Sequence, residues 1–401
     1  MLNRIYNKVI RIIFGIIRKT NQAKNLLLSQ KKLIINPELY GDSLIILKEK
    51  SIERVYFSKI FNLAEESWID FLYPKIEVRR FTNAQVYSSS DFIVTKDGAI
   101  WGKYYKPQWS KNSPLDKDLL KINDQCVFIK KPKNQVVIDY GYSLCGVHCT
   151  TWAHFLVQYL PKLYLLKVIQ SIVGYEITVI LPIYIDHQIR DIVFPYISQL
   201  KNLKVLELNP DEVVNCKTLY YLENTSYISD HANYINPSDI IIPHFTIESL
   251  KKNLVEHFTD NLLTTQDERA IPYRKIYIGR SGYRNIINND EIENYFVSQG
   301  FEVILPHKLT LCEKVNIFRE ASIIVGPYSS GFTNILFCSA GAKALGFINF
   351  QRTFDGYGNS FAKHFGIVLM LVTGYDQNDS IHSSYTIPLH RIKSAYLELI
   401  S

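Results

Sequence analysis

The sequence predicts an α/β protein with two lobes, each built on a mainly parallel sheet covered by helices. Two observations carry this prediction. Strands of buried type alternate with helical patterns in both halves of the chain, which is typical of parallel sheets. A polar stretch from Thr265 to Arg274, which contains Pro272, separates the two runs. We therefore expect a first lobe over residues 33–265 and a second over residues 266–401, closed by a C-terminal helix.

The composition agrees with two well-buried domains. The 401 residues are 47% hydrophobic and 21% charged, which excludes a disordered or fibrous chain. The six cysteines are scattered, and we expect reduced thiols in a cytoplasmic protein. Cys145, His148 and Cys149 form one C-x-x-H-C cluster, but a structural zinc site needs a second ligand pair that the sequence lacks.

Positive charge is concentrated at the N-terminus. Eight Lys and Arg residues precede the first acid, Glu38, whereas the whole chain has a net charge of +7, so the remainder is nearly neutral. This distribution argues against a nucleic-acid partner. Apolar and basic residues separate onto opposite helical faces, and the apolar run Ile12–Ile17 is too short to span a bilayer. We expect residues 1–32 to include a basic amphipathic helix on an anionic membrane surface; packing on the protein's own core is the alternative.

The first lobe begins with a strand meander, expected over residues 76–105 from short alternating apolar pieces. A strand–helix alternation follows. We expect strands at Val136–Asp139, Ile177–Leu181 and Val205–Leu208, and helices at Trp152–Ile169, Gln188–Leu200 and from Pro243 to about Thr264. Asp116-Lys117-Asp118 has the form of a metal-binding Asp-x-Asp, but the Ser-Pro before it favours a helix start.

The second lobe repeats the alternation without a meander. We expect strands at Lys275–Ile278, Phe301–Leu305, Ser322–Val325 and Ala344–Ile348, and helices at Asp290–Gln299, Cys312–Ala321 and Phe332–Cys338. Ligands of open parallel sheets bind beyond the carboxyl ends of the strands. The loops that follow these strands should therefore carry the functional residues.

Two such loops have the chemistry of a phosphate site. The loop 279–285 carries Arg280 and Arg284, whose guanidinium groups match phosphate oxygens. The loop 326–331 is rich in Gly and Ser and precedes a helix, so its N–H groups favour an anion. Solvated arginines and a plain Ser-capped turn are the alternatives. Neither loop matches the motifs of ATP hydrolysis or nicotinamide binding.

The stretch Ile276–Gly341 resembles glycosyltransferase family 61. The shared pattern is a strand followed by Arg280, Arg284 and Asn288, then Gly300-Phe301-Glu302-Val303, Leu309-Thr310-Leu311-Cys312-Glu313-Lys314, and Val325-Gly326-Pro327-Tyr328-Ser329-Ser330-Gly331-Phe332-Thr333-Asn334-Ile335-Leu336-Phe337. In the first lobe, His154 and the following Leu160-Pro161-Lys162-Leu163 are similar to the family's "N-x-x-H-W" and "L-P-R-L". Tyr328 stands where the family has His.

This resemblance implies a fold of the GT-B type, with the acceptor bound by the first lobe, the donor by the second, and inversion at the anomeric carbon. His154 is the expected base. Arg280 and Arg284, with N–H groups around Ser330 and Gly331, would stabilise the leaving diphosphate. Glu313 would bind the donor ribose, or else only cap its helix. The remaining donor-site residues implied are Asn288, Tyr328, Ser329 and Asn334.

The resemblance also implies the partners. The donor is expected to be a nucleotide sugar, with UDP as the nucleotide, and the acceptor a glycan or glycolipid of capsule or lipopolysaccharide type. No metal or other cofactor is expected. The place of action would be the cytoplasmic face of the bacterial cell membrane. Two alternatives are a polysaccharide pyruvyltransferase, which has a similar build and Gly-rich turn, and a non-catalytic glycan-binding homologue, suggested by Tyr328.

Overall fold

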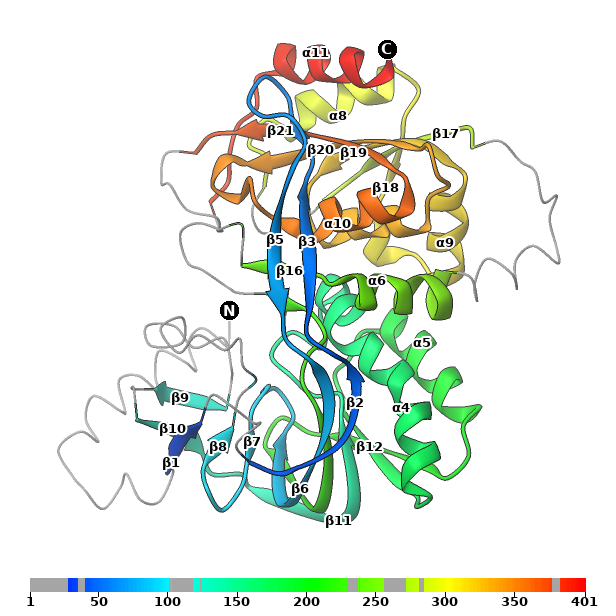
Figure 1. Ribbon diagram of the computed structural model, residues 1–401. Coiled ribbons are helices and arrows are strands. Elements are labelled where there is room, and N and C mark those ends of the chain that lie inside the picture. Colours follow the sequence, from blue (N-terminus) through cyan, green and yellow to red (C-terminus); the bar gives the residue numbers. More distant parts are fainter. Residues whose placement is uncertain are drawn as a thin grey trace.

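The computed structural model describes residues 28–34, 40–100, 102, 118–122, 125–228, 237, 239–255, 272–280, 285–376 and 383–401. Within these ranges the protein is mixed α/β, with two large sheets and eight α-helices (Figure 1). The mixed α/β class predicted from the sequence is confirmed. No helix in the described part is both long and apolar enough to cross a membrane.

The first sheet has 11 strands in the order β13-β12-β11-β14-β6-β7-β8-β1-β10-β9, with β2 also paired to β6. Four of them, β13, β12, β11 and β14, are mutually parallel, and β6 runs antiparallel to β14. The strands are β1 (Leu28–Ile34), β2 (Asp42–Lys48), β6 (Ile76–Tyr87), β7 (Ile93–Val94), β8 (Ala99–Ile100), β9 (Leu119–Ile122), β10 (Cys126–Lys130), β11 (Asn134–Ser143), β12 (Ile177–Pro182), β13 (Leu203–Leu208) and β14 (Glu212–Leu222).

Helices follow the parallel strands of this sheet. The segment after β11 runs through α3 (Trp152–His154), a π-helical turn η3 (Phe155–Tyr159) and α4 (Leu160–Val173). Pro161 explains the π turn, because it has no N–H that could donate to the Val157 carbonyl one turn earlier. That carbonyl accepts a hydrogen bond from the Thr225 hydroxyl instead. Next come α5 (His187–Ser198), α6 (His244–Leu250) and a second π turn, η4 (Lys251–Val255).

The second sheet is parallel throughout, in the order β18-β17-β19-β20-β21-β4. Its strands are β17 (Arg274–Ile278), β18 (Glu302–Ile304), β19 (Ala321–Pro327), β20 (Lys343–Asn349), β21 (Val368–Gly374) and β4 (Lys59–Ile60). Its helices are α8 (Asn289–Ser298), α9 (Leu311–Arg319), the 3-10 helix η6 (Ser330–Phe337), α10 (Gly356–Phe365) and α11 (Leu389–Ile400). In Figure 1, α8 and α11 cover one face, whereas α9 and α10 lie toward the first sheet.

A β-hairpin that the periodicity does not predict joins the two halves. Strands β3 (Ser51–Phe57) and β5 (Ser67–Tyr73) pair in antiparallel register, and β4 lies between them in the chain. The inward side chains Val55 and Phe57 join the largest hydrophobic core. A short piece of the expected first lobe thus forms an edge strand of the second sheet, so the chain crosses between the halves more than once.

The largest core is continuous across both halves. It runs from the helices on the first sheet, through Phe155 and Leu163, to Phe318, Phe332 and Phe361 beneath the second sheet. A separate core lies between the second sheet and α8 and α11, around Phe296 and Phe347. Burial of this shared apolar surface fixes the two sheets against each other, at a gain of roughly 25 cal/mol per Å².

Several local expectations differ from the structure. Residues 28–32 form the start of β1 instead of extending the basic N-terminal helix; the rest of that expected helix lies outside the described residues. The first two pieces of the expected meander are one 12-residue strand, β6, in which Asn83 has a positive φ of 52°. The expected helix Phe332–Cys338 is a 3-10 helix that starts at Ser330.

The Asp-x-Asp segment is only partly visible, because Asp116 and Lys117 lie outside the described residues. Asp118 is buried, and its carboxylate accepts hydrogen bonds from the hydroxyls of Ser89 and Ser90. Burial raises the pKa of this carboxyl above its usual value, although the two serines oppose the shift. Asp118 thus serves the local packing of the first sheet.

Candidate functional site

The two family-like segments meet where α3, which follows β11, contacts η6, which follows β19. The indole Nε1 of Trp152, at the start of α3, donates to Oδ1 of Asn334 in η6 at 2.9 Å. The Asn334 amide in turn donates to the Gly331 carbonyl at 2.8 Å, and Asn334 is fully buried. Side chains 182 positions apart in the chain thereby hold α3 against the loop at the start of η6.

His154 lies on the same short helix as Trp152 and is half-buried. Its Nδ1 is 2.9 Å from Oε1 of Gln158, one helical turn further on. When that amide oxygen accepts the Nδ1 proton, Nε2 carries the lone pair that a general base needs. The ring also stacks on His148 at 4.2 Å between centroids and meets Tyr357 edge-on at 5.6 Å. The imidazole is therefore held in a defined orientation.

Tyr328 is an anchor of α10. Its hydroxyl donates to the Asp355 carbonyl at 3.1 Å and accepts from the Gly358 amide at 2.7 Å. Burial, helped by the Asp355 charge, raises the pKa of this phenol well above its usual value, so the hydroxyl is neutral. A side chain at Gly346 would come within 2.8 Å of the Tyr328 ring. Tyr328 thus positions the helix that carries Tyr357, and its role as a donor contact stays a prediction.

The loop that carries Ser329, Ser330 and Gly331 lies directly beside the end of β17. A Cβ at Gly331 would be 3.3 Å from Cγ2 of Ile278, and one at Gly326 would be 2.7 Å from the Ile278 carbonyl. Gly326 also has a φ of +147°, which other residues rarely adopt. Half-buried Arg280 is two residues beyond Ile278. The structure thus brings the start of the first predicted phosphate loop beside the second; residues 281–284, which include Arg284, lie outside the described residues.

Asn288 and Glu313 are occupied by contacts within the protein. The Asn288 amide donates to the Ile387 carbonyl at 2.8 Å and ties the start of α8 to the C-terminal segment. Glu313 completes a capping box with Thr310, whose N–H and hydroxyl both donate to its carboxylate at 2.8 Å. These two hydrogen bonds lower the pKa of Glu313. Capping is therefore its structural role, and binding of a donor ribose stays a prediction.

Lys314, which the sequence analysis did not single out, lies on α9 at the junction of the two halves, where α3 contacts η6. Its ammonium is 3.6 Å from the centroid of the Trp152 ring and donates to Oε1 of Gln188. The Gln188 amide donates back across the junction to the Pro306 carbonyl at 3.0 Å. Burial lowers the pKa of Lys314 to about 7. The only sequence signal was that Lys314 ends the family-like segment Leu309–Lys314.

The C-x-x-H-C cluster does not form a metal site. Among the described residues there is no group of three or more His, Cys, Asp and Glu side chains placed to hold a metal. Cys145 and Cys149 are buried free thiols, and burial raises the pKa of Cys149 to about 12. His148 instead stacks on His154.

These contacts define a junction of two α/β halves whose histidine-bearing helix faces a Gly- and Ser-rich loop. The family model described as Glycosyltransferase 61 matches residues 152–345 of the chain. The match begins at Trp152 and ends at Leu345 in β20, so it contains both segments of the junction. The resemblance predicted from the sequence is thus confirmed over these residues. No curated protein matches the chain.

Proposed function

We propose that the protein is an inverting glycosyltransferase that moves a sugar from a nucleotide-diphosphate donor to a glycan or glycolipid of the cell surface. The observation that carries the proposal is the Trp152–Asn334 contact, since it places the His154 helix against the loop predicted to bind the donor phosphates. In this proposal the halves act as in the GT-B type, with the donor on the second sheet and the acceptor on the first.

Inversion needs one displacement step. The acceptor hydroxyl oxygen attacks the anomeric carbon, the bond to the diphosphate oxygen breaks, and the diphosphate leaves with the electron pair. Nε2 of His154 takes the hydroxyl proton, with Gln158 holding Nδ1. Arg280, Arg284 and the N–H groups near Ser330 and Gly331 neutralise the charge that develops on the diphosphate. These cations would replace a divalent metal.

The finer identities belong to the same proposal. We expect UDP as the donor nucleotide, and a capsular or lipopolysaccharide glycan as the acceptor. The basic N-terminal residues would hold the protein at the inner face of the membrane, next to acceptors that are attached to lipid.

The donor site is tested by binding of nucleotide diphosphates to the full-length protein, measured by titration calorimetry. Arg280→Ala removes a charge-assisted hydrogen bond worth about 1.5–3 kcal/mol, so affinity for UDP should fall about 10- to 100-fold. Arg80→Ala is the matched control, because Arg80 is exposed and forms an ion pair with exposed Asp42. Its UDP affinity should stay within about twofold.

The catalytic assignment is tested separately with a panel of nucleotide sugars. His154→Ala should lower kcat by about 10²- to 10⁴-fold while leaving UDP affinity unchanged, since loss of a general base affects the chemical step. Full activity of this variant would remove His154 as the base. Unchanged UDP affinity of Arg280→Ala would remove the donor site, and tighter binding of phosphoenolpyruvate than of any nucleotide would favour a pyruvyltransferase.

A further inference from the structure

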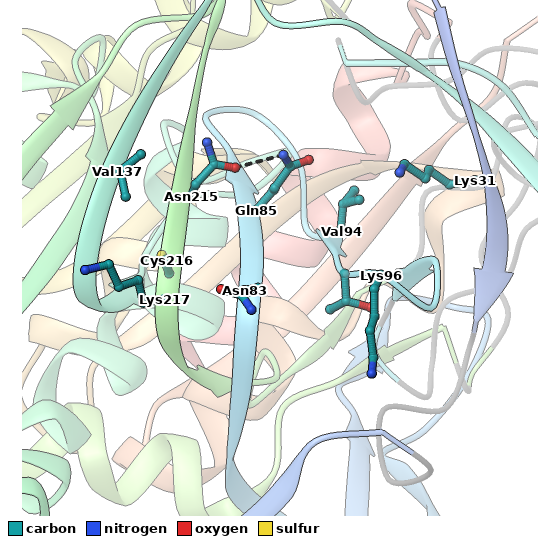
Figure 2. Close-up of a pocket in the computed structure, with 10 residues that line it drawn as sticks. Lys31, Asn83, Gln85, Val94, Lys96, Val137, Asn215, Cys216 and Lys217 are labelled. Atoms are coloured by element: carbon teal, nitrogen blue, oxygen red, sulfur yellow. Dashed lines mark hydrogen bonds between the residues drawn. The ribbon is translucent and has the colours of Figure 1, made fainter.

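A second polar site lies on the outer face of the first sheet, away from the junction. It is a hollow of about 380 Å³ over strands β11, β14, β6, β7 and β1 of that sheet (Figure 2). The residues that line it are Lys31, Asn83, Gln85, Val94, Thr95, Lys96, Val137, Asn215, Cys216 and Lys217.

The floor of the hollow is a row of amides. Gln85 on β6 is the register partner of Asn215 on β14, and Asn215 is the partner of Val137 on β11. Gln85 donates from Nε2 to Oδ1 of Asn215 at 2.8 Å, and Asn215 donates to Gln135 at 3.0 Å. Each primary amide has two donor hydrogens and an acceptor oxygen, so the row retains hydrogen-bonding capacity toward a ligand.

The rim of the hollow is basic. In Figure 2, Lys217 lies on one side of the amides, and Lys31 and Lys96 lie on the other. No Asp or Glu is among the ten lining residues. Lys217 is paired with Asp139 at 2.7 Å, but both side chains are 67% exposed, so water screens this pair strongly. The hollow therefore carries net positive charge above a neutral, hydrogen-bonding floor.

We propose that this hollow binds an acidic saccharide, that is, a glycan segment bearing carboxylate or phosphate groups. Amide side chains exchange hydrogen bonds with sugar hydroxyls, and the lysines meet the acidic groups as point charges. Val137, which is 65% exposed, offers an apolar contact for the C–H face of a sugar ring. The lining contains no aromatic ring on which nucleic-acid bases could stack. A concave, amide-lined floor also suits a chain of sugars better than a membrane surface.

The position of the hollow suggests how the site serves the reaction. Val137 is near the start of β11, and the strand ends at Ser143, six residues or about 20 Å further on. The segment that carries His154 follows that end. Resting on the proposed function, we infer that the bound saccharide is a remote part of the acceptor, held while its end reaches the junction. Long acidic acceptors would then be used better than short or neutral ones.

Calorimetry with oligogalacturonate as the probe, in about 150 mM salt, tests the site directly. The double variant Lys31→Ala/Lys96→Ala should bind this probe at least about fivefold more weakly than the unchanged protein, because two favourable charge contacts are lost. The matched control is Lys167→Ala/Lys201→Ala, whose exposed lysines lie on α4 and after α5. The affinity of this control for oligogalacturonate should stay within about twofold of that of the unchanged protein. Both double variants lose two lysines and keep residues 1–27 unchanged, so a difference between them does not come from binding by that basic segment.

Further binding experiments show which chemical groups of the ligand the site recognises. Gln85→Ala should weaken oligogalacturonate binding, whereas linear polyphosphate should be insensitive to that change because it has no sugar hydroxyls. The proposal would be overturned if Gln85→Ala lost equal affinity for both probes, or if neutral dextran bound as tightly as oligogalacturonate. It would also be overturned if Lys31 and Lys96 mattered only for binding to anionic vesicles. UDP affinity should be unchanged in the double variant. If the donor-site proposal is wrong, only the UDP titration of Arg280→Ala will contradict it. The two proposals can therefore be refuted separately.

Discussion

Replacing Asn334 by alanine should both destabilise the protein and misplace His154. The fully buried amide makes two hydrogen bonds, one accepted from Trp152 Nε1 and one donated to the Gly331 carbonyl. Truncation leaves the Trp152 N–H and the Gly331 C=O without these partners, at about 1–3 kcal/mol each, so the free energy of unfolding should fall by about 2–6 kcal/mol. The kcat for sugar transfer should fall as well, since a small displacement of a catalytic group is costly.

A double-mutant cycle isolates the contact between the halves. Trp152→Phe removes the indole N–H but keeps an aromatic ring near Lys314. Unfolding in urea, measured for Trp152→Phe, Asn334→Ala and the double variant, should give a coupling energy of about 0.5–1.5 kcal/mol. A coupling energy near zero would refute the reasoning, because it would mean that the hydrogen bond contributes nothing to holding the halves together.

The remaining predictions concern a buried cation, an anchoring hydroxyl and the N-terminus. Because the pKa of Lys314 is lowered to about 7 in the folded protein, the unfolded chain binds more protons above that pH, and stability should rise with pH by up to about 1.4 kcal/mol per unit. Urea titrations at pH 7 and 9 should show this rise, and Lys314→Met should lose it. Tyr328→Phe should cost about 2–6 kcal/mol in the same assay, since the Asp355 carbonyl and the Gly358 amide each lose their partner. Removal of residues 1–27, which keeps β1 intact, should abolish flotation with anionic vesicles; persistent flotation would contradict a membrane role for this segment.

Local patterns were sufficient for the alternating strands and helices of both halves. Strand β17 and helix α8, for example, lie within two residues of their expected positions, because apolar periodicity and flanking turn residues act over short distances. The 3-10 form of η6 was missed, and so was the π turn before Pro161, where the Val157 carbonyl accepts a hydrogen bond from the distant Thr225 hydroxyl. Strand β4 was missed because two residues carry no periodicity.

The candidate site was predictable as a list of segments but not as an arrangement. Motif spacing selected His154, Arg280 and the loop 326–331. It did not reveal that Tyr328 anchors α10, and a donor contact by Tyr328 stays a prediction. It named His148 only within the C-x-x-H-C cluster, although His148 stacks on His154. It also missed Lys314, whose position depends on Trp152, far away in the chain.

The sequence by itself determined the α/β class, the family resemblance of residues 152–345 and the two loops that border the junction, because each depends on residues close together in the chain. Only the tertiary structure decided that Trp152 bonds Asn334, that Lys59 and Ile60 join the second sheet, and that amides from three strands form one polar floor. Such contacts arise when distant segments bury a shared apolar core, and the register of that packing is not encoded in any local pattern.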